Sequence, residues 1–186
     1  MNSIAGFSEL ITDESLDAVT REEFKDLILN NSTTLLSIVN NILELSELVS
    51  SYEPLPVEPT DIYGLCIEEM EILKEKILNS DILCITEADK KEIIIPTNAF
   101  YLSRVIGNLL SNAAKFTEKG TITLTCQIDE DQEVVVISVT DTGIGIPTDK
   151  QEWVFERYTK VDDFKPGTGL GLYICRIIIQ RLGGNI

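Results

Sequence analysis

The sequence predicts an α+β protein: an N-terminal antiparallel helical hairpin, then a two-layer α/β sandwich with a mixed, mostly antiparallel sheet. Three observations support this prediction. Residues 1–50 lack proline and repeat apolar side chains at helical spacing. Residues 51–60 hold three prolines, which cannot continue a helix and mark a linker or a short edge strand. From residue 61 onward, helical patterns alternate with short β-rich runs.

The first 50 residues are expected to form two helices joined by the polar stretch 12–20. Two helices alone bury little apolar surface, so we expect them to pair with a second copy as a four-helix bundle. Packing of the hairpin on the rest of its own chain is the alternative. We therefore assign residues 1–50 to dimerisation, 51–60 to a linker and 61–186 to a second domain.

In the second domain we expect helices on one face of the sheet. Thr97 or Asn98 can cap the middle helix, and the polar residues 129–132 have the length of a hairpin connection. The expected helices are Asp61 to about Asn79, the cap to about Phe116, and Gly169–Leu182; the expected strands are Ile82–Glu87, Glu92–Ile95, Thr121–Ile128 and Val134–Thr140.

Composition excludes several classes of partner. Acidic residues outnumber basic ones 31 to 15, and the net charge of −16 repels nucleic acid and anionic membranes. The apolar runs are too short and too charged to span a bilayer, and no secretory signal is visible. The four cysteines form no CxxC pair and the chain has no histidine to complete a zinc site. We therefore expect reduced, mostly buried thiols in a cytosolic protein.

The segment 108–116 carries a polar stripe on an expected helix. Asn108 and Asn112 are spaced i, i+4, and Lys115 follows three residues later, so all three project from one face. Asparagine is mildly unfavourable inside a helix, so two on one stripe call for a reason. Carboxamide oxygens suit Mg²⁺, and a lysine can meet phosphates as a point charge. A solvated polar face is the alternative.

Asp141 ends an alternating strand and enters a Gly-x-Gly turn at Gly143 and Gly145. A carboxylate there can accept a hydrogen bond from the exocyclic amine of a base, and the glycines let the backbone approach the ring. An ordinary Asp-Thr-Gly turn is the alternative.

The segment 167–172 places three glycines before an apolar helix, where free N–H groups can face phosphate. By itself this pattern is weak, and it does not follow a strand as the dinucleotide fingerprint does. The twenty or so residues before it hold Arg157, Lys160 and Lys165 among aromatic side chains, which suits a mobile lid; plain solvated charges are the alternative. Together the three motifs describe an ATP site.

In this order the motifs resemble the catalytic core of sensor histidine kinases of two-component signalling. Residues 108–117 resemble the family's N box, 141–147 its G1 box, 154–158 its F box and 167–172 its G2 box. Residues 2–10 and 43–46 resemble its dimerisation and phosphoacceptor helices. The resemblance covers essentially the whole chain and implies a Bergerat-type ATP-binding fold after the hairpin.

The resemblance also implies roles for individual residues. Asn112 would be the principal Mg²⁺ ligand with Asn108 beside it, and Lys115 would contact phosphate, which makes these three the catalytic candidates. Asp141 would bind the adenine amine. Further nucleotide contacts would come from Gly143, Gly145, Ile146, Gly167, Thr168, Gly169, Leu170, Gly171 and Leu172.

The reaction implied is transfer of the ATP γ-phosphoryl group to a histidine, followed by relay to an aspartate on a response-regulator receiver domain. The resemblance further implies a homodimer through residues 1–50 and a cytoplasmic location, either free or as the cytosolic part of a membrane-anchored sensor. Since the chain has no histidine, we expect a fragment truncated before the acceptor and, because the family's sheet continues, also after residue 186.

Two other functions remain open from the sequence. ATPases of the same nucleotide fold use a glutamate one turn before the metal-binding asparagine as general base, and here that position is Asn108, which cannot accept a proton. A non-catalytic, nucleotide-binding dimeric scaffold is the second alternative.

Overall fold

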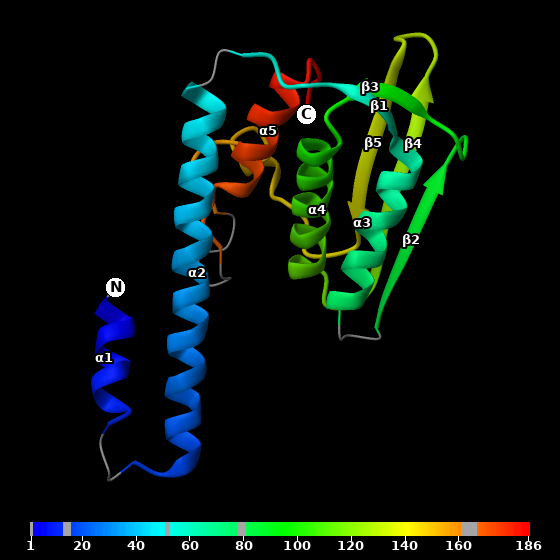
Figure 1. Ribbon diagram of the computed structural model, residues 1–186. Helices are drawn as coiled ribbons and strands as arrows, with labels where there is room; N and C mark the ends of the chain where they lie inside the picture. Colours follow the sequence, from blue (N-terminus) through cyan, green and yellow to red (C-terminus); the bar gives the residue numbers. More distant parts are fainter. Residues whose placement is uncertain (1, 13–15, 51–52, 78–80, 161–166) are drawn as a thin grey trace. The chain divides into compact units, whose positions relative to one another are not determined.

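The computed structural model describes residues 2–12, 16–50, 53–77, 81–160 and 167–186. The chain divides into two compact units, each of which is described by itself. The helical unit comprises residues 1–51 and 162–169, and the α/β unit comprises residues 52–161 and 170–186. Figure 1 labels their helices and strands.

The helical unit contains the predicted hairpin. Helix α1 (Asn2–Leu10) packs beside α2 (Ala18–Ser50), with the rings of Phe7 and Phe24 5.3 Å apart between centroids. Asp17 caps α2, because its carboxylate accepts hydrogen bonds from the backbone N–H and hydroxyl of Thr20, both at 2.9 Å. These bonds hold the pKa of Asp17 below its ordinary value. The polar connection therefore supplies the residue at which the second helix begins.

The α/β unit contains two sheets. Strand β1 (Glu58–Asp61) pairs antiparallel with β3 (Ile94–Thr97). The second sheet has the order β2-β4-β5, in which β2 (Ile82–Ala88) runs parallel to β4 (Gly120–Asp129) and β4 runs antiparallel to β5 (Val134–Asp141). The predicted mixed, mostly antiparallel pairing is confirmed. The division of the strands between two sheets did not follow from the sequence pattern.

The core of this unit lies among α3 (Ile62–Lys76), α4 (Ala99–Phe116) and strand β4. Ile62 and Met70 of α3, Ile106 of α4, and Ile122 and Leu124 of β4 are almost completely buried in one cluster. A third helix, α5 (Gly171–Arg181), packs against α4. Because α4 is held on several sides by this core, the polar residues on its remaining face are presented from a rigid helix.

Element boundaries differ from the predictions where backbone conformation decides them. Asn98 caps α4 by accepting a hydrogen bond from the backbone N–H of Tyr101 at 3.1 Å, as expected. The last helix begins at Gly171 instead of Gly169, since Gly169 has a φ of +69°, which an α-helix cannot include. Helix α3 ends at Lys76, and its predicted end at Asn79 lies outside the described residues.

The four cysteines are free thiols. Cys66, Cys126 and Cys175 are buried and Cys84 is half-buried, as the sequence predicted. A hydrogen bond with the Cys126 thiol, together with burial, raises the pKa of Cys66. This thiol therefore stays protonated and packs as an apolar core group.

Candidate functional site

Helix α4 brings the two predicted carboxamides together. The side-chain Nδ2 of Asn112 donates a hydrogen bond to Oδ1 of Asn108 at 3.3 Å, and both residues are half-buried. Within the described part of the chain, no hydrogen bond reaches Oδ1 of Asn112. The arrangement thus fixes one carboxamide through the other and leaves Oδ1 of Asn112 available as a hard oxygen acceptor.

The start of α5 lies directly against this pair. A Cβ added to Gly171 would come within 2.8 Å of both Oδ1 and Nδ2 of Asn108. Any larger residue at this position would push the carboxamide aside, because 2.8 Å is shorter than real Cβ contacts. Gly171, a glycine of the segment 167–172, therefore packs against the asparagine stripe of α4. The preceding residue, Leu170, is fully buried.

Asp141 stands at the end of β5, opposite Ile122 of β4. Its Oδ1 accepts hydrogen bonds from the backbone N–H of Gly143 at 2.8 Å and from the hydroxyl of Thr117 at 3.4 Å. Among the described residues, no hydrogen bond reaches the second carboxylate oxygen, Oδ2. The carboxylate is exposed, so the protein orients it through one oxygen and leaves the other accessible.

The turn after Asp141 is tied to the end of α4. The backbone N–H of Ile144 donates to the carbonyl of Phe116 at 3.3 Å, and a Cβ on Gly143 would come within 2.3 Å of that same oxygen. Only glycine allows this approach of two backbones. The first and second motifs, which are about 30 residues apart in sequence, are therefore neighbours.

Thr117 was included in the N-box resemblance, but the sequence assigned it no role in the site. It is 3% exposed, follows the last residue of α4 and links that helix to Asp141. A threonine at a helix end has many ordinary explanations, so only its burial and its bond to the carboxylate reveal the role.

Beyond Gly143 the turn is open. Gly145 has a φ of +68°, a left-handed conformation that favours glycine, and space surrounds its Cβ position. Ile144 and Ile146 are 64% and 42% exposed. The two isoleucines offer apolar surface for the faces of a nucleobase, and the carboxylate offers an acceptor for its polar edge.

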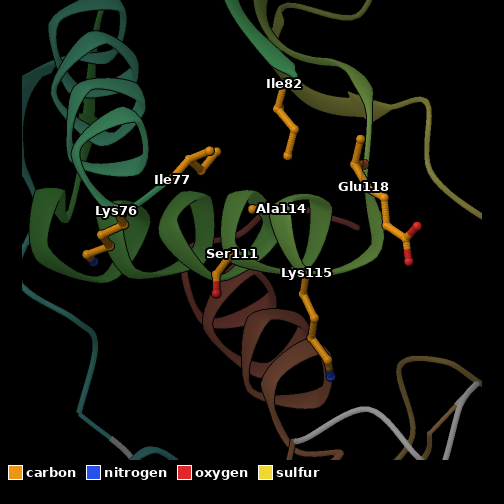
Figure 2. A pocket seen from close by; sticks show the side chains of 8 residues that line it. Lys76, Ile77, Ile82, Ser111, Ala114, Lys115 and Glu118 are labelled. Carbon is orange, nitrogen blue, oxygen red and sulfur yellow. The ribbon is translucent and has the colours of Figure 1, made fainter. Parts of the chain in front are cut away.

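Lys115 is half-buried, with its Nζ 4.7 Å from the centroid of the Phe116 ring. A hollow of about 540 Å³ has a lining that includes Lys115, Ser111 and Ala114 of α4 together with Ile77 and Ile82, all labelled in Figure 2. In this view Ile82 points toward Ala114, whereas Lys115 extends to the opposite side of the helix. Among the described residues, Lys115 is the one predicted site residue that lines this hollow.

The remaining predicted residues are less closely joined. Gly167, Thr168 and Gly169 belong to the helical unit, whereas Leu170, Gly171 and Leu172 belong to the α/β unit. Lys165 of the predicted lid lies outside the described residues. The described part of the lid contains the short 3-10 helix η1 (Thr148–Lys150) and Arg157, whose guanidinium donates to the hydroxyl of Tyr173 at 2.7 Å.

Residues 97–186 match the family described as histidine kinase-, DNA gyrase B-, and HSP90-like ATPase. The chain carries an ATP-binding domain of this family. All predicted site residues, from Asn108 to Leu172, fall within the matched range. The fold agrees, since solved histidine kinases have the same helical and α/β parts.

Individual relatives are histidine kinases and sensor proteins. The aerobic respiration control sensor protein ArcB of Escherichia coli (strain K12) is 30% identical over 195 residues, covering 100% of this chain and 24% of ArcB. The crystal structure of full-length ShkA in complex with AMPPNP has a TM-score of 0.75 and 30% identity, covering 98% of this chain and 38% of that one.

The histidine kinase ThkA in complex with response regulator protein TrrA has a TM-score of 0.76 and 26% identity, covering 97% of this chain and 50% of that one. The chain spans 11–26% of the length of the curated relatives that it matches. Within the described residues, no helix combines the length and apolar character needed to cross a bilayer.

Proposed function

We propose that this chain is the catalytic core of a two-component sensor histidine kinase, which binds Mg²⁺–ATP and transfers the γ-phosphoryl group to a histidine. The observation that carries this proposal is the position of Asp141, which ends β5 and is hydrogen-bonded to Thr117 just after α4. Its Oδ1 is occupied by Gly143 and Thr117 and its Oδ2 is accessible, as recognition of an adenine amine requires.

The carboxamide pair fits a magnesium ion by the chemistry of its donors. Mg²⁺ takes few protein ligands in nucleotide sites and keeps phosphate oxygens and waters around it. Among the described residues, no group of three or more His, Cys, Asp or Glu side chains could hold a metal ion. Asn112, whose Oδ1 receives no hydrogen bond among the described residues, would hold the metal through that oxygen, with Asn108 beside it. When bound, the ion would neutralise charge on the phosphates.

Lys115 and the glycine segment would complete phosphate binding. Lys115 lies on the same helix, one turn after Asn112, and would place a positive charge beside the phosphates in a chain whose net charge is −16. The backbone N–H groups at the start of α5 would face the phosphates, aided by the positive end of the helix dipole. Contacts from Gly145, Ile146 and Leu170–Leu172 belong to the same proposal, whereas those of Gly167, Thr168 and Gly169 stay predictions from the sequence.

Transfer to a positioned acceptor is favoured over hydrolysis. In the transfer, a nitrogen of the acceptor imidazole attacks the γ-phosphorus, the bond to the bridging oxygen breaks, and ADP leaves. Activation of water instead requires a general base, and the carboxamide of Asn108 cannot accept a proton. The 186 residues hold no histidine, so the acceptor must come from outside them.

The proposed kinase function implies two protein partners. ThkA is known in complex with the response regulator TrrA, and we propose that a receiver domain is likewise the next acceptor here. We further propose that residues 1–50 form a homodimer. Along α2, the side chains of Leu36, Leu43 and Val49 are each more than half exposed, which leaves apolar surface for a second copy.

Titration with AMPPNP and transfer of labelled phosphate to a supplied histidine-containing helical hairpin test this function. The wild-type chain should bind AMPPNP more tightly with Mg²⁺ and phosphorylate the hairpin. Asn112→Ala should keep its fold but lose both the Mg²⁺ effect and transfer. Asn31→Ala, which removes a half-buried carboxamide from α2, is the matched control and should behave as wild type.

The outcomes separate the alternatives. Nucleotide binding without transfer to the hairpin would support a scaffold, and steady phosphate release without an acceptor would support an ATPase. Full transfer by Asn112→Ala would remove this residue from the proposed site.

A further inference from the structure

Arg157 and Tyr173 make two distinct interactions across the α/β unit. The guanidinium donates a hydrogen bond to the tyrosine hydroxyl at 2.7 Å, and the guanidinium carbon lies 4.7 Å from the centroid of the tyrosine ring. The hydrogen bond requires the tyrosine hydroxyl, and the cation–π contact requires the tyrosine ring. Substitution of either residue therefore weakens the interaction. The two residues are 16 positions apart in sequence.

Arg157 belongs to a turn that has few other anchors. Trp153 bonds within the turn, through its indole N–H to the carbonyl of Asp149 at 3.0 Å, and the backbone N–H of Glu156 returns to Trp153 at 2.9 Å. Val154 is 6% exposed and is the one buried side chain among residues 151–158. The turn is therefore held to the rest of its unit through Val154 and through the Arg157 side chain.

The backbone next to Arg157 is strained. Tyr158 has a φ of +62°, which is unfavourable for a residue other than glycine, and its side chain is 68% exposed. An exposed residue gains little from its own packing that would offset such a conformation. Contacts of neighbouring residues must therefore maintain the backbone conformation of Tyr158. The hydrogen bond from Arg157, the preceding residue, to Tyr173 is such a contact.

Tyr173 belongs to the first turn of α5, two residues after Gly171. The backbone of Gly171 lies against the carboxamide of Asn108, which in turn accepts the bond from Asn112. Because a helix moves as a rigid element, a shift of its first turn at Tyr173 also moves Gly171. A continuous set of contacts thus joins the Trp153–Tyr158 turn to the carboxamide pair.

We propose that the hydrogen bond and cation–π contact between Arg157 and Tyr173, together called the latch, dock the Trp153–Tyr158 turn on α5. The latch thereby keeps Asn108 and Asn112 positioned for nucleotide. Both are positioning residues. The effect on nucleotide binding rests on the proposed function, whereas the docking of the turn does not.

Trp153 is the one tryptophan of the chain and lies in the docked turn, so its fluorescence reports the latch without any ligand. Arg157→Gln should make Trp153 more accessible to acrylamide quenching, because the turn loses its polar anchor. Arg157→Lys keeps a cation over the ring and should give a smaller increase. Tyr173→Phe keeps the ring but loses the hydroxyl and should also be intermediate, whereas Tyr63→Phe on α3 is the matched control and should match wild type.

The second measurement is AMPPNP affinity with Mg²⁺. We expect Arg157→Gln to weaken it about three- to tenfold through loss of one charge-assisted bond and one cation–π contact at a partly exposed site. Melting curves and far-ultraviolet circular dichroism identify variants that have lost their fold. If Arg157→Gln does not fold, Arg157→Lys and Tyr173→Phe provide the test instead.

The results distinguish the two proposals. Unchanged quenching in Arg157→Gln and Tyr173→Phe overturns the latch, whatever the nucleotide does. Increased quenching with unchanged affinity overturns the positioning of Asn108 and Asn112. A wild-type chain that does not bind AMPPNP overturns the proposed function, while the quenching series still decides the docking of the turn.

Discussion

Replacing Gly171 by alanine tests the contact that joins α5 to the carboxamide pair. The new Cβ would lie 2.8 Å from both Oδ1 and Nδ2 of Asn108, whereas ordinary van der Waals contact begins near 3.4 Å. The carboxamide must therefore move by about 0.6 Å, the difference between these distances. The hydrogen bond from Asn112 is already 3.3 Å long, so this movement is enough to break it.

The expected consequence separates stability from binding. Loss of one neutral hydrogen bond costs about 0.5–1.5 kcal/mol. Gly171 is the first residue of α5, where alanine recovers less than the about 1 kcal/mol that it gains in a helix interior, so the free energy of unfolding should fall by about 1 kcal/mol or less. Nucleotide affinity has no such compensation and should fall about two- to tenfold as the carboxamides lose their mutual orientation.

Calorimetric titration with AMPPNP and Mg²⁺, together with thermal melting, measures both quantities. Gly6→Ala is the matched control, because no atom lies within 4 Å of its added Cβ, and it should stabilise α1 without changing affinity. In an Asn108→Ala background the clash disappears, so Gly171→Ala should then cost almost nothing in affinity. Equal losses in both backgrounds, or wild-type affinity in the single variant, would refute the contact as the cause.

Two further predictions address the base site and the helical unit. Asp141→Asn keeps an Oδ1 acceptor for Gly143 but presents an amide donor where the adenine amine would donate; affinity should fall by about 1.5–3 kcal/mol in the same titration, and an unchanged Kd would count against the adenine assignment. Leu43→Asp places a charge on a side chain that is 58% exposed on α2, and should convert a dimer into a monomer in sedimentation analysis. A wild-type chain that is monomeric at high concentration would contradict dimerisation altogether.

Several features of the fold could be predicted because they depend on local geometry. The i, i+4 spacing of Asn108 and Asn112 alone places their side chains within reach on a helix, and the structure has them hydrogen-bonded. Residue type and place before an apolar stripe narrowed the cap to Thr97 or Asn98, and the structure has Asn98. The last helix was predicted two residues too early, because the left-handed backbone of Gly169 is not visible in a helical pattern.

The amino-acid sequence by itself determined the order of helices and strands, the polar face of α4 and the residue types available for a nucleotide. These follow from spacing along a few turns of chain. Only the tertiary structure decided that Thr117 and Gly143 occupy one oxygen of Asp141, that Gly171 lies against Asn108, and that Arg157 meets Tyr173. Such contacts join residues up to 63 positions apart, and their geometry is set by how the buried faces of α3, α4, α5 and β4 pack, which no short stretch of sequence encodes.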